Sequence, residues 1–254
     1  MKLKVKFPLR TKKVNKVIVS KEIIEPGILS VIIKNHDKRN ALSDNIKLEL
    51  ESLALDLRDD TDIKAVILSG ENGNFSSGND IKDKNAFGEG LGLAEARQKN
   101  RLGLRMCDAW TNIPQISVAS IQGACIGGGV SLALSCDFRI CSLDTYFHAP
   151  EVELGITYAW GSIPKLVSLI GPSRAKLFAL ACKKLDANTL IEWGLCEKVS
   201  ENPLIESKEF LKDIIKKPIV AQQMVKESIN RQVSHNQVSI LEQDQVLLTR
   251  KYNK

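Results

Sequence analysis

Two glycine-bearing segments constrain the fold of this chain most, because each follows an apolar run of the kind that forms β-strands. The first is Phe75-Ser-Ser-Gly-Asn-Asp80. The second is Ile121-Gln-Gly-Ala-Cys-Ile-Gly-Gly-Gly129, and it continues directly into a helical pattern. The first N–H groups of a helix have no partner within the helix and carry a partial positive charge, so glycines there allow an anion to approach closely. This pattern favours an α/β fold with an anion or oxyanion site at the turns.

The spacing of the triplet Gly127-Gly128-Gly129 excludes the common nucleotide-binding motifs. It matches neither the dinucleotide-binding pattern G-x-G-x-x-G nor the phosphate loop G-x-x-x-x-G-K-[ST]. The chain also has no G-x-S-x-G nucleophile elbow. A glycine triplet alone could serve only the close packing of a strand on a helix. The other motifs described below favour a functional interpretation.

Composition narrows the class of protein. With 254 residues and 43% apolar content, the chain can bury the core of one large domain. It has no apolar run of about 18 residues and no apolar secretory stretch at its beginning, so we expect a cytoplasmic protein without a membrane partner. The six cysteines form no C-x-x-C pair and the three histidines have no metal-binding spacing, so we expect reduced thiols and no metal site.

The net charge of +6 does not by itself indicate a nucleic-acid partner. Much of the excess comes from lysines and arginines among the first sixteen residues, and such a tail is usually solvated. Aromatic residues, which stack on bases in nucleic-acid sites, make up only 5% of the chain. We therefore expect no nucleic-acid binding.

Hydrophobic periodicity predicts an alternation of strands and helices. The predicted segments are a hairpin over 17–34, a helix capped by Ser43, a strand over 63–69, a helix over 91–111, a strand over 116–121, a helix after the glycine triplet, short strands at 138–141 and 146–147, a helix over 172–193, and helical segments from 208 to the end. Functional residues in such folds lie at the turns from strand to helix.

With these elements in place, the chain resembles the enoyl-CoA hydratase/isomerase family, also called the crotonase family, from about residue 17 to about residue 230. The motifs that carry the resemblance occur in the family's order and spacing. They are Lys38-Arg-Asn-Ala-Leu42, Phe75-Ser-Ser-Gly-Asn-Asp80, the segment from Ile121 to Gly129, Cys136-Asp137, Glu151-Val-Glu-Leu-Gly155, Gly171-Pro172 and Trp193-Gly-Leu195. Their combination makes a chance match improbable.

The resemblance implies a spiral of ββα repeats over residues 1–200 and a C-terminal helical trimerisation region over 201–254. It also implies a homotrimer or a dimer of trimers. The ligand would be an acyl-CoA thioester, so that coenzyme A is part of the substrate and no separate cofactor is needed. Relatives often end in an acidic-glycine and phenylalanine segment that this chain lacks, which leaves the oligomer open.

By position in the family, the backbone N–H groups of Asn79 and Gly128 would form an oxyanion hole around the thioester carbonyl, and Glu151 would transfer the proton. Drawing a proton from the carbon beside a thioester builds negative charge on that oxygen, which such donors stabilise. Glu153 is the competitor for the proton-transfer role, and strand-like alternation would point it away from Glu151. The other residues expected to contact substrate are Lys38, Ala41, Gly78, Asp80, Ile81, Gly127, Ser131 and Tyr158.

Ser131 stands where hydratases with two carboxylates place the first of them, and a hydroxyl cannot replace a carboxylate base. One glutamate is enough to shift a double bond in a 3-enoyl-CoA, and hydroxycinnamoyl-CoA hydratase-lyases in the family hydrate with one glutamate. The reaction is therefore either hydration or isomerisation. A thioester hydrolase and a catalytically silent acyl-CoA-binding protein are the alternatives. Dienoyl-CoA isomerisation is disfavoured, because Ser131 and Ala159 stand where that activity uses acidic residues.

Tyr158 and Trp160 lie in a loop where many relatives are rich in glycine, so we expect them to narrow the acyl pocket. His148 is expected to be a packed strand residue, and Cys125 a small buried side chain rather than a nucleophile. Lysines near Lys226 could meet the phosphates of coenzyme A.

Overall fold

The computed structural model describes residues 18–81 and 90–234. Its larger sheet has six strands in the order β1-β2-β3-β4-β6-β9, and a smaller sheet has three in the order β5-β7-β8. The strands are β1 Val19–Glu25, β2 Ile28–Ile33, β3 Ala65–Gly70, β4 Ile116–Ile121, β5 Ala124–Ile126, β6 Phe138–Cys141, β7 Tyr146–His148, β8 Leu185–Asp186 and β9 Lys198–Val199. Only the pairs β1–β2 and β7–β8 are antiparallel.

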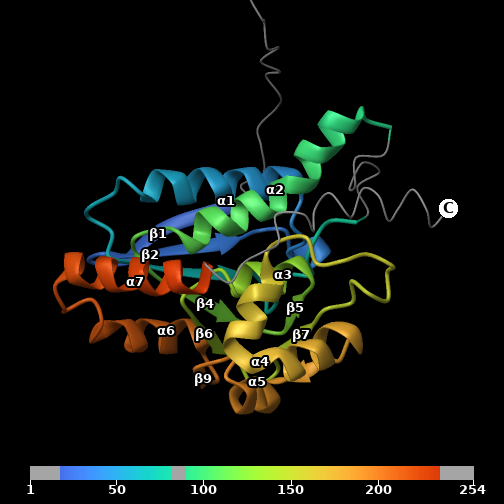
Figure 1. The fold of residues 1–254 in the computed structure, drawn as a ribbon. Coiled ribbons are helices and arrows are strands. Elements are labelled where there is room, and N and C mark those ends of the chain that lie inside the picture. Colours follow the sequence, from blue (N-terminus) through green and yellow to red (C-terminus); the bar gives the residue numbers. More distant parts are fainter. Residues whose placement is uncertain (1–17, 82–89, 235–254) are drawn as a thin grey trace, which may run out of the picture.

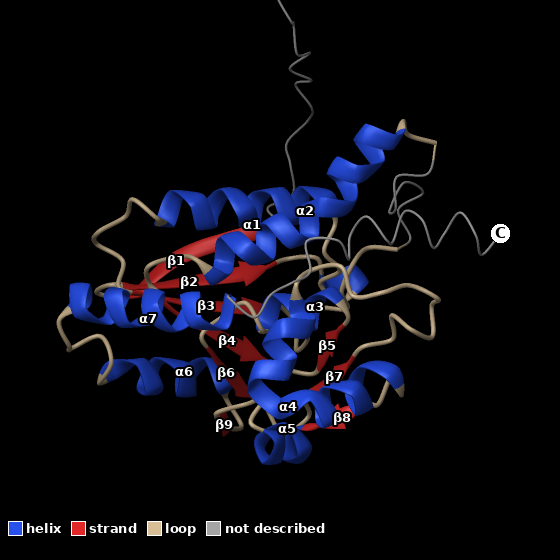
Figure 2. Cartoon of the chain, viewed as in Figure 1, coloured by secondary structure: helices blue, strands red, loops and turns tan. Residues whose placement is uncertain are grey.

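Helices surround these strands (Figures 1 and 2). The helices are α1 Asp44–Leu57, α2 Leu93–Thr111, α3 Gly128–Ala133, α4 Ser162–Leu180, α5 Ala187–Trp193, α6 Pro203–Lys212 and α7 Ile219–Ser234, with a short 3₁₀ helix at His36–Lys38. In Figure 1, α1 and α2 lie side by side above β1 and β2, whereas α4 and α5 lie beside the smaller sheet.

Local signals explain the first elements. Gly27, at φ 79°, makes the turn of the predicted hairpin, which is confirmed. The Ser43 side chain accepts a hydrogen bond from the N–H of Ile46 and so caps α1, as predicted. The predicted strands at 63–69, 116–121, 138–141 and 146–147 and the predicted helix at 91–111 are also confirmed to within two residues.

The chain repeats a unit of two strands and a helix, which β4, β5 and α3 show most clearly. The second strand of each early unit is reduced to a single bridge, at Leu42 with Asn79 and at Ser76 with Cys125. These bridges extend the smaller layer beyond β5, β7 and β8, so that Asn79 lies near the beginning of α3. The fold thus brings the two glycine-bearing segments together.

Two apolar clusters fill the two faces of the larger sheet. The larger cluster lies under α1, α2 and α4 and includes Trp110, Phe147 and Phe178. The smaller one joins β2, β3, β4 and β6 to Leu211 and Phe210 of α6. Helix α6 therefore covers the sheet of the spiral core, although it follows the expected boundary at residue 200. The trimerisation role of 201–254 stays a prediction, and its last residues, 235–254, lie outside the described part of the chain.

The helical prediction over 172–193 is confirmed only in part, because two helices separated by strand β8 cover this range. Helix α4 begins earlier, bends at Gly171 with φ 73° and ψ 165°, and ends at Leu180. Strand β8 then pairs with β7 before Asp186 caps α5 by accepting from the N–H of Thr189. The pairing of β8 with β7 interrupts the helical stretch. Apolar periodicity along the sequence does not reveal pairing between distant strands.

Lys226 of α7 is buried and does not point to a phosphate site. It is 8% exposed, and its Nζ donates to the carbonyl of Gln115 at 2.6 Å and to Oδ2 of Asp137 at 2.7 Å. The lysine thereby ties α7 to the segments that begin β4 and β6.

We expect Lys226→Met to lower the free energy of unfolding by about 3 kcal/mol, because it leaves Asp137 inside the protein without its cation. Urea denaturation monitored by circular dichroism measures this. Lys216→Met is the matched control, because Lys216 pairs with Asp213 at an exposed place on the described part of the chain, and its loss should leave the denaturation midpoint unchanged. Equal midpoints for all three proteins would contradict the anchoring role of Lys226.

Candidate functional site

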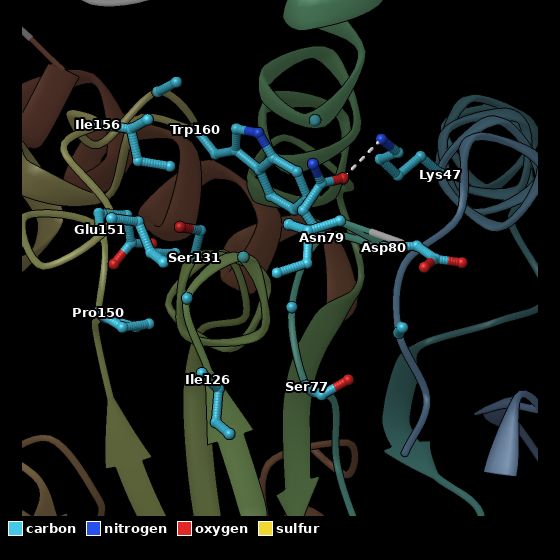
Figure 3. A pocket seen from close by; sticks show the side chains of 18 of the residues that line it. Lys47, Ser77, Asn79, Asp80, Ile126, Ser131, Pro150, Glu151, Ile156 and Trp160 are labelled. Carbon is cyan, nitrogen blue, oxygen red and sulfur yellow. Dashed lines mark hydrogen bonds between the residues drawn. The ribbon is translucent and has the colours of Figure 1, made fainter. Parts of the chain in front are cut away.

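A cavity of about 500 Å³ opens where the glycine-bearing segments meet. Its walls come from four parts of the chain: 37–41 before α1, 77–81 after β3, the first residues of α3, and the segment from Pro150 to Trp160. Two helices, α1 and α2, contribute further residues (Figure 3). At one end Lys38 and Ile81 are largely exposed, whereas the other end reaches Gly103 inside α2.

The backbone N–H groups of Asn79 and Gly128 line this cavity, and neither donates to another residue in the described part of the chain. The neighbouring N–H groups are occupied: Gly78 donates to the Ser76 hydroxyl at 3.1 Å, and Gly127 donates to the carbonyl of His148 at 2.8 Å. Two free donors at one place in a cavity can hold a developing oxyanion.

Gly78 must be glycine for this arrangement. Its φ is +86°, and a Cβ added there would lie 2.5 Å from the carbonyl oxygen of Ile126 and 3.1 Å from the nitrogen of Gly128. A side chain would therefore push apart the segments that carry the two donors. The close approach also explains why Gly78 belongs to the predicted site.

Glu151 reaches the same cavity from the segment after β7. One carboxylate oxygen, Oε1, is 3.2 Å from the place where a Cβ on Gly127 would stand, and the other, Oε2, is buried without a hydrogen-bond partner among the described residues. Burial raises the pKa of Glu151 to about 7. A carboxyl group that titrates near neutrality can both take and return a proton.

The reason given for excluding Glu153 is wrong, although Glu153 does lie outside the cavity. The segment after Pro150 is a turn and not a strand, because the carbonyl of Glu151 accepts from the N–H groups of Leu154 and Ile156. Within this turn Glu153 is exposed and is absent from the cavity wall. Turn geometry, and not strand alternation, separates the two carboxylates.

The other predicted residues fall into two groups. Ser131, in α3, is 4% exposed and lies in the cavity wall with Gly127 and Glu151. At the exposed end, the ammonium of Lys38 contacts Oδ2 of Asp80 at 2.6 Å. Ala41, Asp80 and Ile81 also line that end. The structure thus brings all the predicted site residues to one cavity except Tyr158.

The prediction that Tyr158 contacts the substrate and narrows the acyl pocket is corrected by the structure. It is 6% exposed, and its hydroxyl donates toward the carbonyls of Ala149 at 3.3 Å and Ala179 at 3.5 Å, inside the larger apolar cluster. It therefore anchors the loop and does not narrow the cavity. Trp160, two residues later, does line the cavity. An extended chain would point the two rings to the same side, but the loop before α4 turns them apart.

The sequence analysis missed Lys47. This α1 residue is 3% exposed, and its ammonium donates to Oδ1 of Asn79 at 3.0 Å and contacts Asp44 at 2.7 Å (Figure 3). Asp44 also pairs with Lys99 of α2 at 2.5 Å. Burial raises the pKa of Asp44, but hydrogen bonds from the two lysines outweigh it and leave the pKa below its ordinary value. Because a lysine can only donate, this contact fixes the Asn79 side-chain amide with its oxygen toward Lys47.

Gly103 was missed as well. It lies within α2, and a Cβ on it would come 2.0 Å from the indole of Trp160. The signal was present in the sequence, because an isolated glycine in a helical pattern often has a packing reason. The helical pattern around Gly103 did not indicate that Trp160 would be the residue packed against it.

Neither a metal-binding group of side chains nor a helix able to cross a membrane occurs in residues 18–81 and 90–234. All six cysteines are buried and free. Burial raises the pKa of the Cys125 thiol, in agreement with a packed and unreactive side chain.

The model of the family described as enoyl-CoA hydratase/isomerase matches residues 24–254. The chain belongs to the enoyl-CoA hydratase/isomerase family. A short-chain-enoyl-CoA hydratase from Clostridium acetobutylicum is 31% identical over 221 residues, which cover 85% of this chain and 82% of the relative. The human ethylmalonyl-CoA decarboxylase is 28% identical over 211 residues, which cover 80% of this chain and 67% of the relative.

Among solved structures, an enoyl-CoA hydratase from Bacillus anthracis superposes with a TM-score of 0.79 at 26% identity, covering 92% of this chain and 88% of that one. The resemblance to the crotonase family and the expected spiral fold are therefore confirmed. Members of this family carry out several reactions on acyl-CoA thioesters, so family membership alone does not select one.

Proposed function

We propose that this chain hydrates a 2-enoyl-CoA or shifts the double bond of a 3-enoyl-CoA, with Glu151 as the single acid and base. The observation that carries the proposal is the buried carboxyl of Glu151, which shares one cavity with two backbone N–H groups that have no partner among the described residues. The thioester oxygen would accept from the N–H groups of Asn79 and Gly128. No cofactor is required, because coenzyme A is part of the substrate.

Each reaction uses the same parts. In hydration, the carboxylate takes a proton from water, the resulting hydroxide bonds to C3, and the electron pair of the double bond moves onto the thioester oxygen. Glu151 then returns the proton to C2. In isomerisation, Glu151 removes a proton from C2 and returns it to C4. Both routes pass through an enolate that the two N–H donors stabilise.

The buried Ser131 hydroxyl supports a single-base reaction over one with two carboxylates. It can hold a water molecule or a substrate oxygen, but it cannot take the proton at neutral pH. A thioester hydrolase would use the same donors for a tetrahedral intermediate and would release the coenzyme A thiol. A silent acyl-CoA-binding protein would leave every thioester unchanged.

Mass spectrometry of products formed in deuterated water tests the proposal, using 2-enoyl-, 3-enoyl-, aromatic enoyl- and malonyl-type CoA thioesters. A gain of water identifies a hydratase, and deuterium at C2 or C4 with a moved double bond identifies an isomerase. Free thiol, loss of carbon dioxide from a malonyl-type thioester, or tight binding without turnover would each overturn the proposal.

The pH dependence of kcat/KM should follow the ionisation of the Glu151 carboxyl group. Because its pKa is raised to about 7 by burial, the carboxylate that acts as base forms only as the pH rises, and kcat/KM should increase through pH 6–8 with a midpoint at about 7. Glu153→Gln, a change at an exposed neighbour, should leave this midpoint in place. A profile flat from pH 5 to pH 8 would exclude Glu151 as the base.

A homotrimer or a dimer of trimers and a cytoplasmic location stay predictions. The apolar side chains that α7 exposes, Val220, Met224, Val225 and Ile229, are 58–64% exposed and support the first of them. Light scattering coupled to size exclusion measures the oligomer.

A further inference from the structure

Trp160 lines the cavity between α2 and the beginning of α3. A Cβ on Gly128 would lie 2.3 Å from Cζ3 of the indole, and a Cβ on Gly103 would lie 2.0 Å from Cε2. The ring is therefore wedged between the beginning of α3, which supplies one oxyanion donor, and the middle of α2. It also packs against the larger apolar cluster.

Surrounding groups hold this ring in place. Gly161 follows Trp160 and, at φ 71°, turns the chain into the first residue of α4. The ammonium of Lys47 lies 5.6 Å from the ring centroid, within range for a cation–π contact. Figure 3 shows Trp160 in the same wall of side chains as Asn79 and Lys47. A ring fixed from both sides is a barrier and not a mobile gate.

The direction of the acyl chain follows from the two ends of the cavity. With its carbonyl oxygen at Asn79 and Gly128, a thioester would place the bulky coenzyme A toward the exposed end near Lys38 and Ile81. The acyl group then extends past Glu151 toward α2. The indole lies beside Gly128, so an acyl chain that extends in this direction would meet the ring.

We infer that Trp160 limits the acyl group to short chains and is a specificity-determining residue of this site. The inference rests on the proposed acyl-CoA function, but it can be tested by binding without turnover. Each additional methylene buried in a pocket raises affinity by a factor of about four, so a chain series reports where the pocket ends.

Calorimetric titration with butyryl-, hexanoyl-, octanoyl- and decanoyl-CoA is the experiment. For the wild type we expect the affinity to stop rising after butyryl-CoA. For Trp160→Ala we expect the ratio of octanoyl-CoA to butyryl-CoA affinity to rise at least about tenfold. Trp160→Phe, which preserves more packing, should give a smaller change in the same direction and covers the case in which the alanine variant does not fold.

Tyr158→Phe is the matched control, because Tyr158 is a buried aromatic residue of the same loop that does not line the cavity. Its chain-length profile should equal that of the wild type. Wild-type affinity that rises steadily to decanoyl-CoA, or Trp160 variants with an unchanged profile, would overturn the inference. If no thioester binds at all, the proposed function fails. If these saturated thioesters bind with the expected length limit but no enoyl-CoA thioester is converted in the product analysis, only the proposed reaction fails.

Discussion

Replacing Glu151 by glutamine should lower kcat by about 10²–10⁴-fold with little change in KM, since the amide keeps the size of the side chain but cannot carry the proton. The two backbone donors and the cavity remain, so the substrate should still bind. Steady-state kinetics on the substrate identified by product analysis measures both constants. Product formation at the wild-type rate would assign the proton transfer to another group.

The thermal stability of Glu151→Gln shows whether a loss of activity comes from the missing proton transfer or from unfolding. Burial raises the pKa of Glu151 from 4.5 to about 7, so the folded protein disfavours the carboxylate, and the associated loss of stability develops as the pH rises from 4.5 through about 7. Glu151→Gln removes the buried charge. At pH 8 we therefore expect it to unfold at the same temperature as the wild type or higher. Glu153→Gln, at the exposed neighbour, should change neither kcat nor the melting temperature.

Replacing Gly78 by alanine should lower kcat by about 10²–10³-fold, the effect expected when one oxyanion donor is displaced. The added Cβ would clash with the carbonyl of Ile126 at 2.5 Å and press on the nitrogen of Gly128 at 3.1 Å. Both contacts are backbone atoms, which cannot turn aside as a flexible side chain can. The loss should appear in kcat more than in KM, because the charge develops only during the reaction.

Gly73→Ala is the control for backbone strain. Gly73 has φ +72°, close to that of Gly78, but an added Cβ meets nothing within 4 Å and the residue does not line the cavity. Both variants should lose stability because alanine disfavours positive φ, by about 1 kcal/mol at Gly73. Only Gly78→Ala should lose activity. If kcat of Gly78→Ala stays within threefold of the wild-type value, the assignment of the Asn79 N–H to the oxyanion hole is contradicted.

Local sequence signals predicted much of the fold correctly because the responsible forces act between near neighbours. Ser43 caps α1 through the N–H of Ile46, and Gly27 supplies the positive φ of the hairpin turn. The same reasoning failed in part at 172–193, where pairing of β8 with β7 interrupts an apolar helical pattern. It also failed after Pro150, where strand-like alternation was the reason given for separating Glu151 from Glu153 although the segment forms a turn.

The amino-acid sequence by itself determined the glycine turns, the strands that precede them and the glutamate directly after Pro150, since these depend on backbone conformation and residue type at known positions. Only the tertiary structure decided which side chains share the cavity. Lys47 comes to Asn79 across 32 residues of sequence, and the indole of Trp160 fills the space left by Gly103 and Gly128. Tyr158 turns into the core instead. Such contacts depend on how distant elements pack, and periodicity along the chain does not encode the direction in which one loop side chain points.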